Sequence, residues 1–244
     1  MLKIRKFPRP LLSISTVALI FAFFSLFFKD KWLFGGISLL VAFLIYGTYL
    51  LSYDYKASNL MEKAKKYLDK SQVDQAVECI VSSAKLNPDE ENLIKIFGHQ
   101  KKNLDAFKVV ASRLQKELKE NDTPFMRFII ASFYYFCGNL KEVKELLTAV
   151  PEDKRTIKMV RLLGSALYDM KDYSGSIDVL SFYAPPSLPT NEDELAVAFG
   201  LGVAYLSTGD KDKALDYLLR VETRNAKFGN VSRILATIDE SESK

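Results

Sequence analysis

Side chains that could carry chemistry are few in this chain, and they do not gather into a recognisable pattern. His99 is the single histidine among 244 residues, and the two cysteines, Cys79 and Cys137, lie far apart. The sequence holds no Cys-x-x-Cys pair, no Walker motif and no dinucleotide-binding glycine pattern. A nucleophile with a base, a metal cluster and a phosphate loop are all missing from the sequence. We predict that the chain is not an enzyme and binds no metal, cofactor or small-molecule substrate.

The acidic residues and the cysteines have structural explanations. The pairs Glu90-Glu91 and Asp210-Asp212 stand at expected helix starts and turns, where a carboxylate interacts favourably with the helix dipole. Cys79 and Cys137 fall inside amphipathic helical patterns, so we expect buried, reduced thiols, as in a cytoplasmic domain. A disulfide between Cys79 and Cys137 is the alternative that their spacing allows.

Two uncharged stretches near the N-terminus are long enough to cross a membrane. Residues 11–28 read LLSISTVALIFAFFSLFF, and residues 32–51 read WLFGGISLLVAFLIYGTYLL. At about 1.5 Å of rise per residue, such stretches approach or match a hydrocarbon thickness of roughly 30 Å. We predict a transmembrane helical hairpin over residues 11–51. Two alternatives are a cleaved signal peptide and a buried hairpin of a soluble protein. The sequence has neither the small-x-small cleavage site of the first nor the polar stripe of the second, so we disfavour both.

Lysine and arginine counts predict how this hairpin is oriented. Residues 1–10 form a basic leader with four such residues, and five lysines follow between residues 56 and 70. Positive residues stay on the cytoplasmic side, so we expect both termini and the rest of the chain there, at a bacterial inner (cytoplasmic) membrane. The lysines near the membrane favour contact with anionic lipids. A net charge of +4 without a recognised module argues against nucleic-acid binding.

Five copies of one pattern follow the predicted spans. A column of small residues recurs at spacings of 34, 33, 33 and 38: Ala64, Gly98, Ala131, Gly164 and Gly202. Twelve residues after each stand Ala76, Val110, Val143, Ser176 and Ala214. Sixteen residues after each stand Ile80, Leu114, Leu147, Leu180 and Leu218. Small side chains at fixed offsets allow two helices to approach closely, and the larger ones fill the space beside them.

Three of these copies carry a family resemblance. The stretches LGVAYLSTGDKDKALDYLLR (201–220), LGSALYDMKDYSGSIDVL (163–180) and IIASFYYFCGNLKEVKELL (129–147) resemble the tetratricopeptide repeat family, a helix-turn-helix unit of about 34 residues. The resemblance implies an all-α fold, a right-handed α-α superhelix of about five repeats over residues 57–224. The second copy departs from the family most, with Lys101 at an aromatic position and Val110 at a small one.

Turns and caps complete this prediction. Gly138 and Gly209 are placed for the left-handed geometry that ends a first helix. Residues 184–190, APPSLPT, account for the longer interval as a rigid bulging loop, and Thr190 with Asp193 resembles a helix-capping pair. Residues 225–244 form a capping helix and a tail.

The resemblance also implies a binding groove, because first helices of successive repeats line a concave surface in this family. The groove positions that this implies are Lys95, His99, Lys102, Phe125, Phe128, Tyr135, Phe136, Lys158, Arg161, Tyr168 and Phe199. Aromatic residues flanked by positive charge suit an amphipathic helix or extended peptide with acidic groups. The alternatives are that the aromatics, above all Phe125 and Phe128, seal contacts between repeats and that His99 is an ordinary polar surface residue.

The resemblance and the predicted anchor together imply a function. We expect a non-catalytic adaptor or scaffold that mediates protein–protein interaction at the cytoplasmic face of a membrane, in the assembly or organisation of a membrane-associated complex. The alternative is an integral structural subunit whose transmembrane hairpin packs against partner helices. Gly35, Gly36, Ser38 and Gly47 would then provide the small residues for close helix packing.

Overall fold

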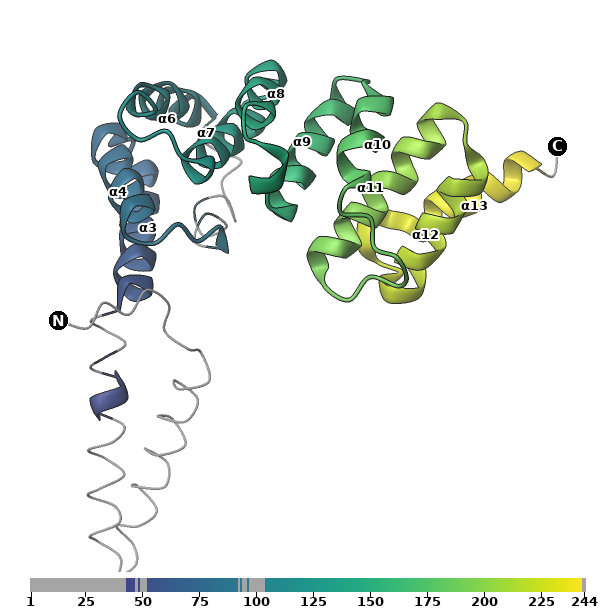
Figure 1. Ribbon diagram of the computed structural model, residues 1–244, viewed down its shortest axis with the longest axis horizontal. Helices are drawn as coiled ribbons and strands as arrows, with labels where there is room; N and C mark the ends of the chain where they lie inside the picture. Colours follow the sequence, from purple (N-terminus) through teal and green to yellow (C-terminus); the bar gives the residue numbers. More distant parts are fainter. Residues whose placement is uncertain are drawn as a thin grey trace, which may run out of the picture. The chain divides into compact units, whose positions relative to one another are not determined.

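The computed structural model describes residues 43–46, 48, 52–91, 93, 96 and 104–242 (Figure 1). Within these residues the secondary structure is helical and contains no β-strand, which confirms the predicted all-α class. The chain separates into two compact units, Met1–Ala106 and Phe107–Lys244. The predicted domain boundaries at residues 10, 51, 57 and 224 stay predictions.

The predicted membrane segment lies almost entirely outside the described residues. Of residues 11–28 and 32–51, only 43–46 and 48 are described, and they are helical. In the described part of the chain, every helix is too short or too polar to cross a membrane. The hairpin and the basic leader therefore stay predictions.

In the first unit, α3 (Tyr53–Asp69) packs against α4 (Val73–Leu86). Ser52 has an extended backbone, and its hydroxyl accepts a hydrogen bond from the Tyr55 amide at 3.2 Å, so α3 begins directly after it. The buried Ser83 hydroxyl donates to the Ala57 carbonyl at 2.9 Å, a bond from α4 to α3. The side chains of Asn87 and Asp54 are hydrogen-bonded where α4 ends and α3 starts.

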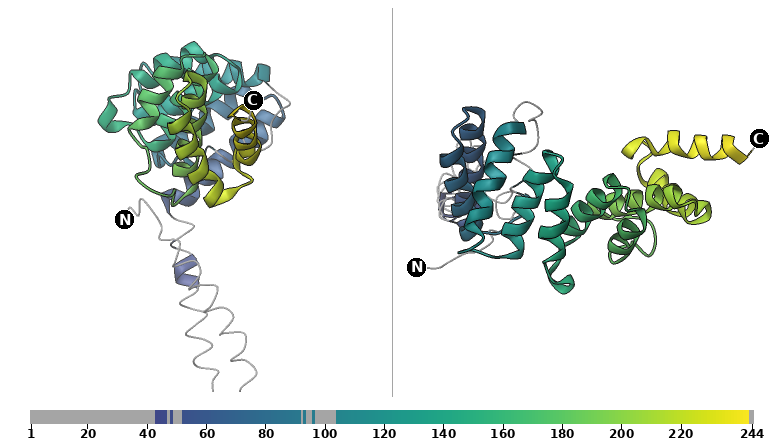
Figure 2. Two further views of the ribbon diagram at one scale, coloured as in Figure 1. Left: turned by 90° about the vertical axis from the view of Figure 1, so that its right-hand side faces the viewer. Right: turned by 90° about the horizontal axis from the view of Figure 1, so that it is seen from above.

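The second unit contains a succession of helix pairs. After α6 (Leu104–Glu117), whose first three residues precede the division, come α7 (Pro124–Phe136), α8 (Leu140–Thr148), α9 (Ile157–Asp169), α10 (Tyr173–Ser181), α11 (Glu192–Thr208), α12 (Lys211–Asn225) and α13 (Val231–Glu242). Within pairs, α7 packs on α8, α9 on α10 and α11 on α12. Contacts between α8 and α9, α10 and α11, α7 and α9, and α9 and α11 join each pair to the next, and α13 covers α12 (Figure 2).

The small-residue columns lie where the two helices of a pair cross. A Cβ added to Gly202 would stand 2.7 Å from Leu218 Cγ, and one added to Gly164 would stand 2.6 Å from Leu180 Cγ. Real Cβ atoms essentially never come closer than 3.0 Å to such a neighbour, so any larger residue here would force the facing leucine to shift. The described column members are buried in every copy: Ala64, Ala76, Ile80, Val110, Leu114, Ala131, Val143, Leu147, Gly164, Ser176, Leu180, Gly202, Ala214 and Leu218. Gly98 lies outside the described residues.

The turn inside a pair uses the left-handed backbone at one repeated position. Gly138 and Gly209 have φ of 75° and 87°, as predicted. Seven residues after the small column, Ser71 and Lys171 take the same place in other copies, with φ of 56° and 64°. Neither residue type signals this geometry, so sequence reasoning missed both.

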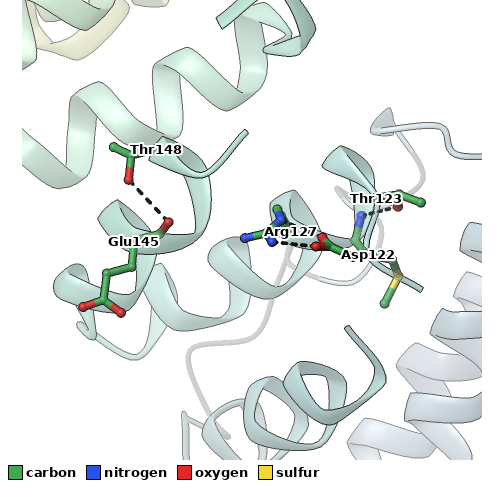
Figure 3. A network of polar contacts seen from close by, with 6 residues as sticks. Asp122, Thr123, Arg127, Glu145 and Thr148 are labelled. Atoms are coloured by element: carbon green, nitrogen blue, oxygen red, sulfur yellow. Dashed lines mark hydrogen bonds and ion pairs between the residues drawn. The ribbon is translucent and has the colours of Figure 1, made fainter. Parts of the chain in front are cut away.

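Helix starts carry side-chain caps. The Thr123 hydroxyl accepts from the Met126 amide at 3.1 Å, beside an ion pair between Arg127 and Asp122 at 2.7 Å (Figure 3). At α11 the predicted capping pair of Thr190 with Asp193 is wrong by one residue. Asn191 is the cap, and its side-chain oxygen accepts from the Glu194 amide at 2.9 Å. The Glu194 carboxylate in turn accepts a hydrogen bond from the Thr190 amide at 2.7 Å.

Residues 184–190 form the loop between α10 and α11, and α12 holds it in place. Arg220 Nη1 donates to the Pro185 carbonyl at 3.2 Å. Pro185 and Pro189 are buried, whereas residues 186–188 between them are exposed. The extra residues of this interval are therefore anchored at both ends and project at the middle.

Candidate protein-binding face

The predicted groove residues that the structure describes lie on the first helices of three consecutive pairs, all in the second unit. We call this set the first-helix face: Phe125, Phe128, Tyr135 and Phe136 on α7, Lys158, Arg161 and Tyr168 on α9, and Phe199 on α11. Contacts of α7 with α9 and of α9 with α11 place these helices next to one another. Lys95, His99 and Lys102 lie outside the described residues.

Phe125 and Phe128 are core residues of this unit. Their exposed fractions are 8% and 7%, and the Ser132 hydroxyl donates back to the Phe128 carbonyl at 2.8 Å. Side chains with so little exposure present almost no surface to a partner. Their burial favours the alternative that these two rings seal contacts inside the protein.

Tyr135 and Tyr168 link one first helix to the next by the same kind of contact. Tyr135 Oη donates to Asp169 Oδ2 at 2.9 Å, and Tyr168 Oη lies 3.2 Å from Ser207 Oγ. In both pairs the tyrosine stands four residues after the small column and its partner stands five residues after the next one. The repeat register therefore produces a regular polar link between neighbouring first helices.

Tyr135 stays protonated well above physiological pH. Burial and the neighbouring Asp169 carboxylate disfavour the phenolate and raise the pKa of Tyr135 to about 12, while the hydrogen bond with Ser165 works in the opposite direction. The phenol is consequently a hydrogen-bond donor and not a candidate base or nucleophile.

Arg161 already has a carboxylate partner from the following first helix. Its guanidinium is ion-paired with Asp193 of α11, and the two side chains are 35% and 28% exposed. An acidic group of a binding partner would therefore replace Asp193 beside Arg161. Lys158, one turn earlier on α9, is half-buried.

Phe136 is the predicted aromatic that remains most open. It is 44% exposed, and its ring stands edge-on to Phe107 at 6.2 Å and to Tyr135 at 6.5 Å between centroids. Two supporting rings hold this side chain at the surface in a defined orientation. A partly exposed, supported aromatic ring is the side chain that most often anchors an interface.

Phe199 packs against the C-terminal part of the chain. Its ring packs edge-on against Phe228, with centroids 5.6 Å apart, in the short turn before α13. A Cβ added to Gly229 would lie 2.5 Å from the Phe199 ring, so the backbone also approaches it closely. Phe199 joins α11 to the closing segment, and its ring is half-buried there.

A separate hollow of about 160 Å³ lies beside α9 and α10, lined by Glu152, Arg155, Val160, Asp178, Val179 and Phe182. Arg155 donates to the carbonyls of Val150 at 2.9 Å and Thr148 at 3.1 Å, which satisfies the end of α8. Sites for small molecules are typically about 300–1,000 Å³, so this hollow is too small for one. Among the described residues, no group of three or more His, Cys, Asp or Glu is placed to hold a metal ion.

Sequence reasoning missed the internal partners of this face, although the signal was present. The pairing of Tyr135 with Asp169 and of Tyr168 with Ser207 depends on the offset between neighbouring repeats. The sequence contains this offset, because each tyrosine lies four residues after its small-column residue and its partner lies five residues after the next one. No family model matches the chain, and no curated protein sequence matches it.

Proposed function

We propose that the chain is a membrane-anchored adaptor or scaffold of the tetratricopeptide repeat type. In this proposal residues 11–51 form a transmembrane hairpin, and residues 57–224 form about five repeats wound as a right-handed superhelix in the cytoplasm. The first-helix face binds a protein partner and so helps to assemble or organise a membrane-associated complex. The proposed partners are that protein and membrane lipids, without nucleic acid, and the role is not catalytic.

The recurrence of one crossing contact is the observation that supports the repeat assignment most directly. Gly164 faces Leu180 and Gly202 faces Leu218 at the same offset of sixteen residues. The left-handed turn also recurs seven residues after the small column in four copies, at Ser71, Gly138, Lys171 and Gly209. A chain that repeats both its helix crossing and its turn is built from copies of one unit.

The first-helix face supports binding because its polar links are partly exposed and can be exchanged. The Arg161–Asp193 pair is about one third exposed, and pairs of this kind typically contribute only ~0.2–1 kcal/mol. A peptide carboxylate can take the place of Asp193 at little cost, while an apolar side chain packs on Phe136. An amphipathic helix or extended peptide with an acidic group provides both features.

Paired variants test this face in the full-length, membrane-inserted chain. Phe136→Ala with Arg161→Gln removes the exposed ring and the exchangeable cation. We expect recovery of the partner by chemical crosslinking and mass spectrometry to fall about tenfold or more, as for an interface anchor. Arg161→Gln also removes the pair with Asp193, so the control below removes an ion pair as well, and Tyr135 and Tyr168 keep their links between first helices.

The matched control removes an exposed phenylalanine from the C-cap of α10 and an ion-paired arginine from α12, in the same unit. Phe182, which is 62% exposed, and Arg220, which pairs with Asp216 at 2.6 Å, meet this need. Phe182→Ala with Arg220→Gln should leave recovery unchanged. Equal recovery from both double variants, with equal thermal unfolding temperatures, would remove the first-helix face from the proposal.

The anchor needs its own test. Replacing residues 11–51 by an unrelated transmembrane hairpin should preserve function if the spans only hold the repeats at the membrane. Loss of function with intact membrane insertion would instead favour the integral subunit, whose hairpin recognises partner helices.

A further inference from the structure

The first helix α3 carries lysines where the first helices of the third, fourth and fifth copies carry buried apolar side chains. One residue before the small column stands Lys63, and the later copies have Ile130, Leu163 and Leu201 there, all with 0% exposure. Two residues after the column stands Lys66, and the third, fourth and fifth copies have Phe133, Ala166 and Ala204, again with 0% exposure, while the second copy has Gln100. Both lysines are exposed.

In the later copies these positions face the preceding repeat. The Phe133 ring lies 5.2 Å from the Phe107 ring of α6, edge to face. Leu201 belongs to one buried cluster with Val160 of α9 and Leu180 of α10. The corresponding surface of α3 follows the same repeat geometry, and the residues directly before α3 in the sequence are the predicted membrane spans.

Two further lysines extend this surface into a stripe. Lys56, Lys63, Lys66 and Lys70 follow one another at spacings of seven, three and four, so they share one side of the helix. All four are exposed, and together they extend over roughly 20 Å, from Lys56 in the first turn of α3 to Lys70 at its C-cap. The buried residues of α3 are on the other side, where the helix packs on α4: Ala57, Met61, Ala64 and Leu68. We call the four lysines the lysine stripe.

The chain immediately before α3 indicates what this surface meets. The second predicted membrane span ends at residue 51, and Ser52 starts α3 with an extended backbone. The stripe therefore begins five residues beyond the predicted span. Lys56 is close enough to the predicted span for attraction to anionic headgroups, which acts over roughly 8 Å at physiological salt, and the other three lysines reach the headgroups when α3 lies along the bilayer surface.

We propose that the lysine stripe binds the anionic headgroups of the membrane that holds the chain, and so fixes the first repeat against the lipid surface. This inference rests on the membrane anchor of the proposed function and adds a named surface to it. The competing explanation is that the lysines only make the first repeat soluble. Glutamine would serve that purpose as well as lysine, whereas headgroup binding needs the positive charge.

Amine labelling of the full-length chain tests the stripe. The chain is reconstituted into vesicles of phosphatidylcholine alone or with about 30% phosphatidylglycerol, and acetylation of each lysine is followed by mass spectrometry. We expect labelling of Lys63 and Lys66 to slow about threefold or more in anionic vesicles and to recover in about 0.5 M NaCl. Lys85 on α4 and Lys116 on α6, which are also exposed, should label equally in both vesicles.

A charge-neutral variant separates headgroup binding from solubility. In Lys63→Gln with Lys66→Gln, protection of Lys56 and Lys70 in anionic vesicles should fall toward the phosphatidylcholine value, while the thermal unfolding temperature stays that of the wild type. The matched variant Lys85→Gln with Lys116→Gln should keep full protection. Undiminished protection of Lys56 and Lys70 in the first variant would overturn the proposal.

Flotation with the vesicles distinguishes failure of the anchor from failure of the stripe. A chain that floats with both vesicle types but labels equally in both would overturn the lysine stripe and leave the anchor intact. If the four lysines are protected from acetylation equally in vesicles with and without anionic lipid, protein and not headgroups covers the stripe, which also overturns the proposal. A chain that floats with neither vesicle type would overturn the anchor and the stripe together.

Discussion

Two kinds of contact hold the second unit together, and they differ in chemistry and exposure. Inside a helix pair, Gly202 meets Leu218 and Gly164 meets Leu180 at a buried crossing where an added Cβ would lie less than 3.0 Å from the leucine side chain. Between neighbouring first helices, Tyr135 meets Asp169 and Arg161 meets Asp193 through polar groups that water still reaches. The first kind of contact is defined by shape and the second by hydrogen bonds and charge.

The difference separates the residues that determine the fold from those that can take part in binding. Burial makes the crossing contacts insensitive to salt and pH, and an added methyl group has nowhere to go. Polar contacts at the surface are individually weak because water competes for the same groups. A binding partner can replace such contacts without unfolding the pairs beneath them.

The largest effect should come from overfilling a crossing. In Gly202→Leu the new Cβ alone would lie 2.7 Å from Leu218 Cγ, so α11 and α12 must separate. We expect the free energy of unfolding of the full-length chain to fall by roughly 1–3 kcal/mol, measured by urea denaturation. Thr208→Leu, at an exposed position of the same helix, is the control and should change it little. Equal stability of both variants would contradict the crossing geometry.

A smaller loss is expected where a crossing contains one buried hydrogen bond. Ser176 Oγ donates to the Gly164 carbonyl at 2.9 Å with both residues buried. Alanine fills the same column at Ala76 and Ala214, so Ser176→Ala fits the space and loses only the bond. We expect a destabilisation of about 1 kcal/mol in the same assay. Ser174→Ala, an exposed serine of α10, should be near neutral, and a matching loss there would contradict this assignment.

Removing one polar link between first helices should cost less again. Tyr135→Phe keeps the ring and deletes the hydroxyl that donates to Asp169, and we expect a loss of about 0.5–1 kcal/mol because the pair is partly exposed. Since the folded pKa of about 12 exceeds the usual value near 10, the stabilisation by Tyr135 is complete below pH ~10 and disappears toward pH ~12. Absorbance of tyrosinate during alkaline titration should lose its highest transition in Tyr135→Phe. Retention of that transition would assign it to another tyrosine.

The smallest effect is expected at the exposed turn of the fourth copy. Hydrogen bonds from Lys144 and from the Gly175 amide lower the pKa of Asp172 below its usual value. A lowered pKa stabilises the fold above the unfolded value near 4, and this contribution disappears as pH falls through the folded pKa. Asp172→Asn should cost about 0.2–0.5 kcal/mol at pH 7 and nothing near pH 2. Thermal unfolding at pH 7, 4 and 2 measures this, and a pH-independent difference would contradict it.

Sequence reasoning performed best on the crossings and least well on contacts between repeats. A column such as Ala131, Gly164 and Gly202 marks a close helix approach because only small side chains permit it. The left-handed backbone at Lys171 and Ser71 carries no such mark, since the neighbouring helices impose it on residues that do not prefer it. The turn position could be predicted only where glycine occupies it.

The sequence predicted which positions form the candidate face, but not which of these side chains are free to contact a partner. The register predicted Tyr135 and Tyr168 as groove positions on successive first helices, but it could not show that Asp169 and Ser207 already bind them. The same register could not decide between burial and exposure for Phe125, which is buried, and Phe136, which is open. Those outcomes depend on the stagger between adjacent pairs, and sequence spacing alone does not determine it.

The proline-rich loop at residues 184–190 offers a practical entry point for labelling this protein. Its anchored prolines and the arginine of α12 isolate the exposed residues 186–188 from the helix packing on either side. A short epitope or a fluorophore-binding tetracysteine sequence placed between Pro186 and Leu188 would extend into solvent and leave the packing of the helix pairs on either side unchanged. The longest interval in the repeat is thus the place where a reporter can be attached while the proposed binding face stays open.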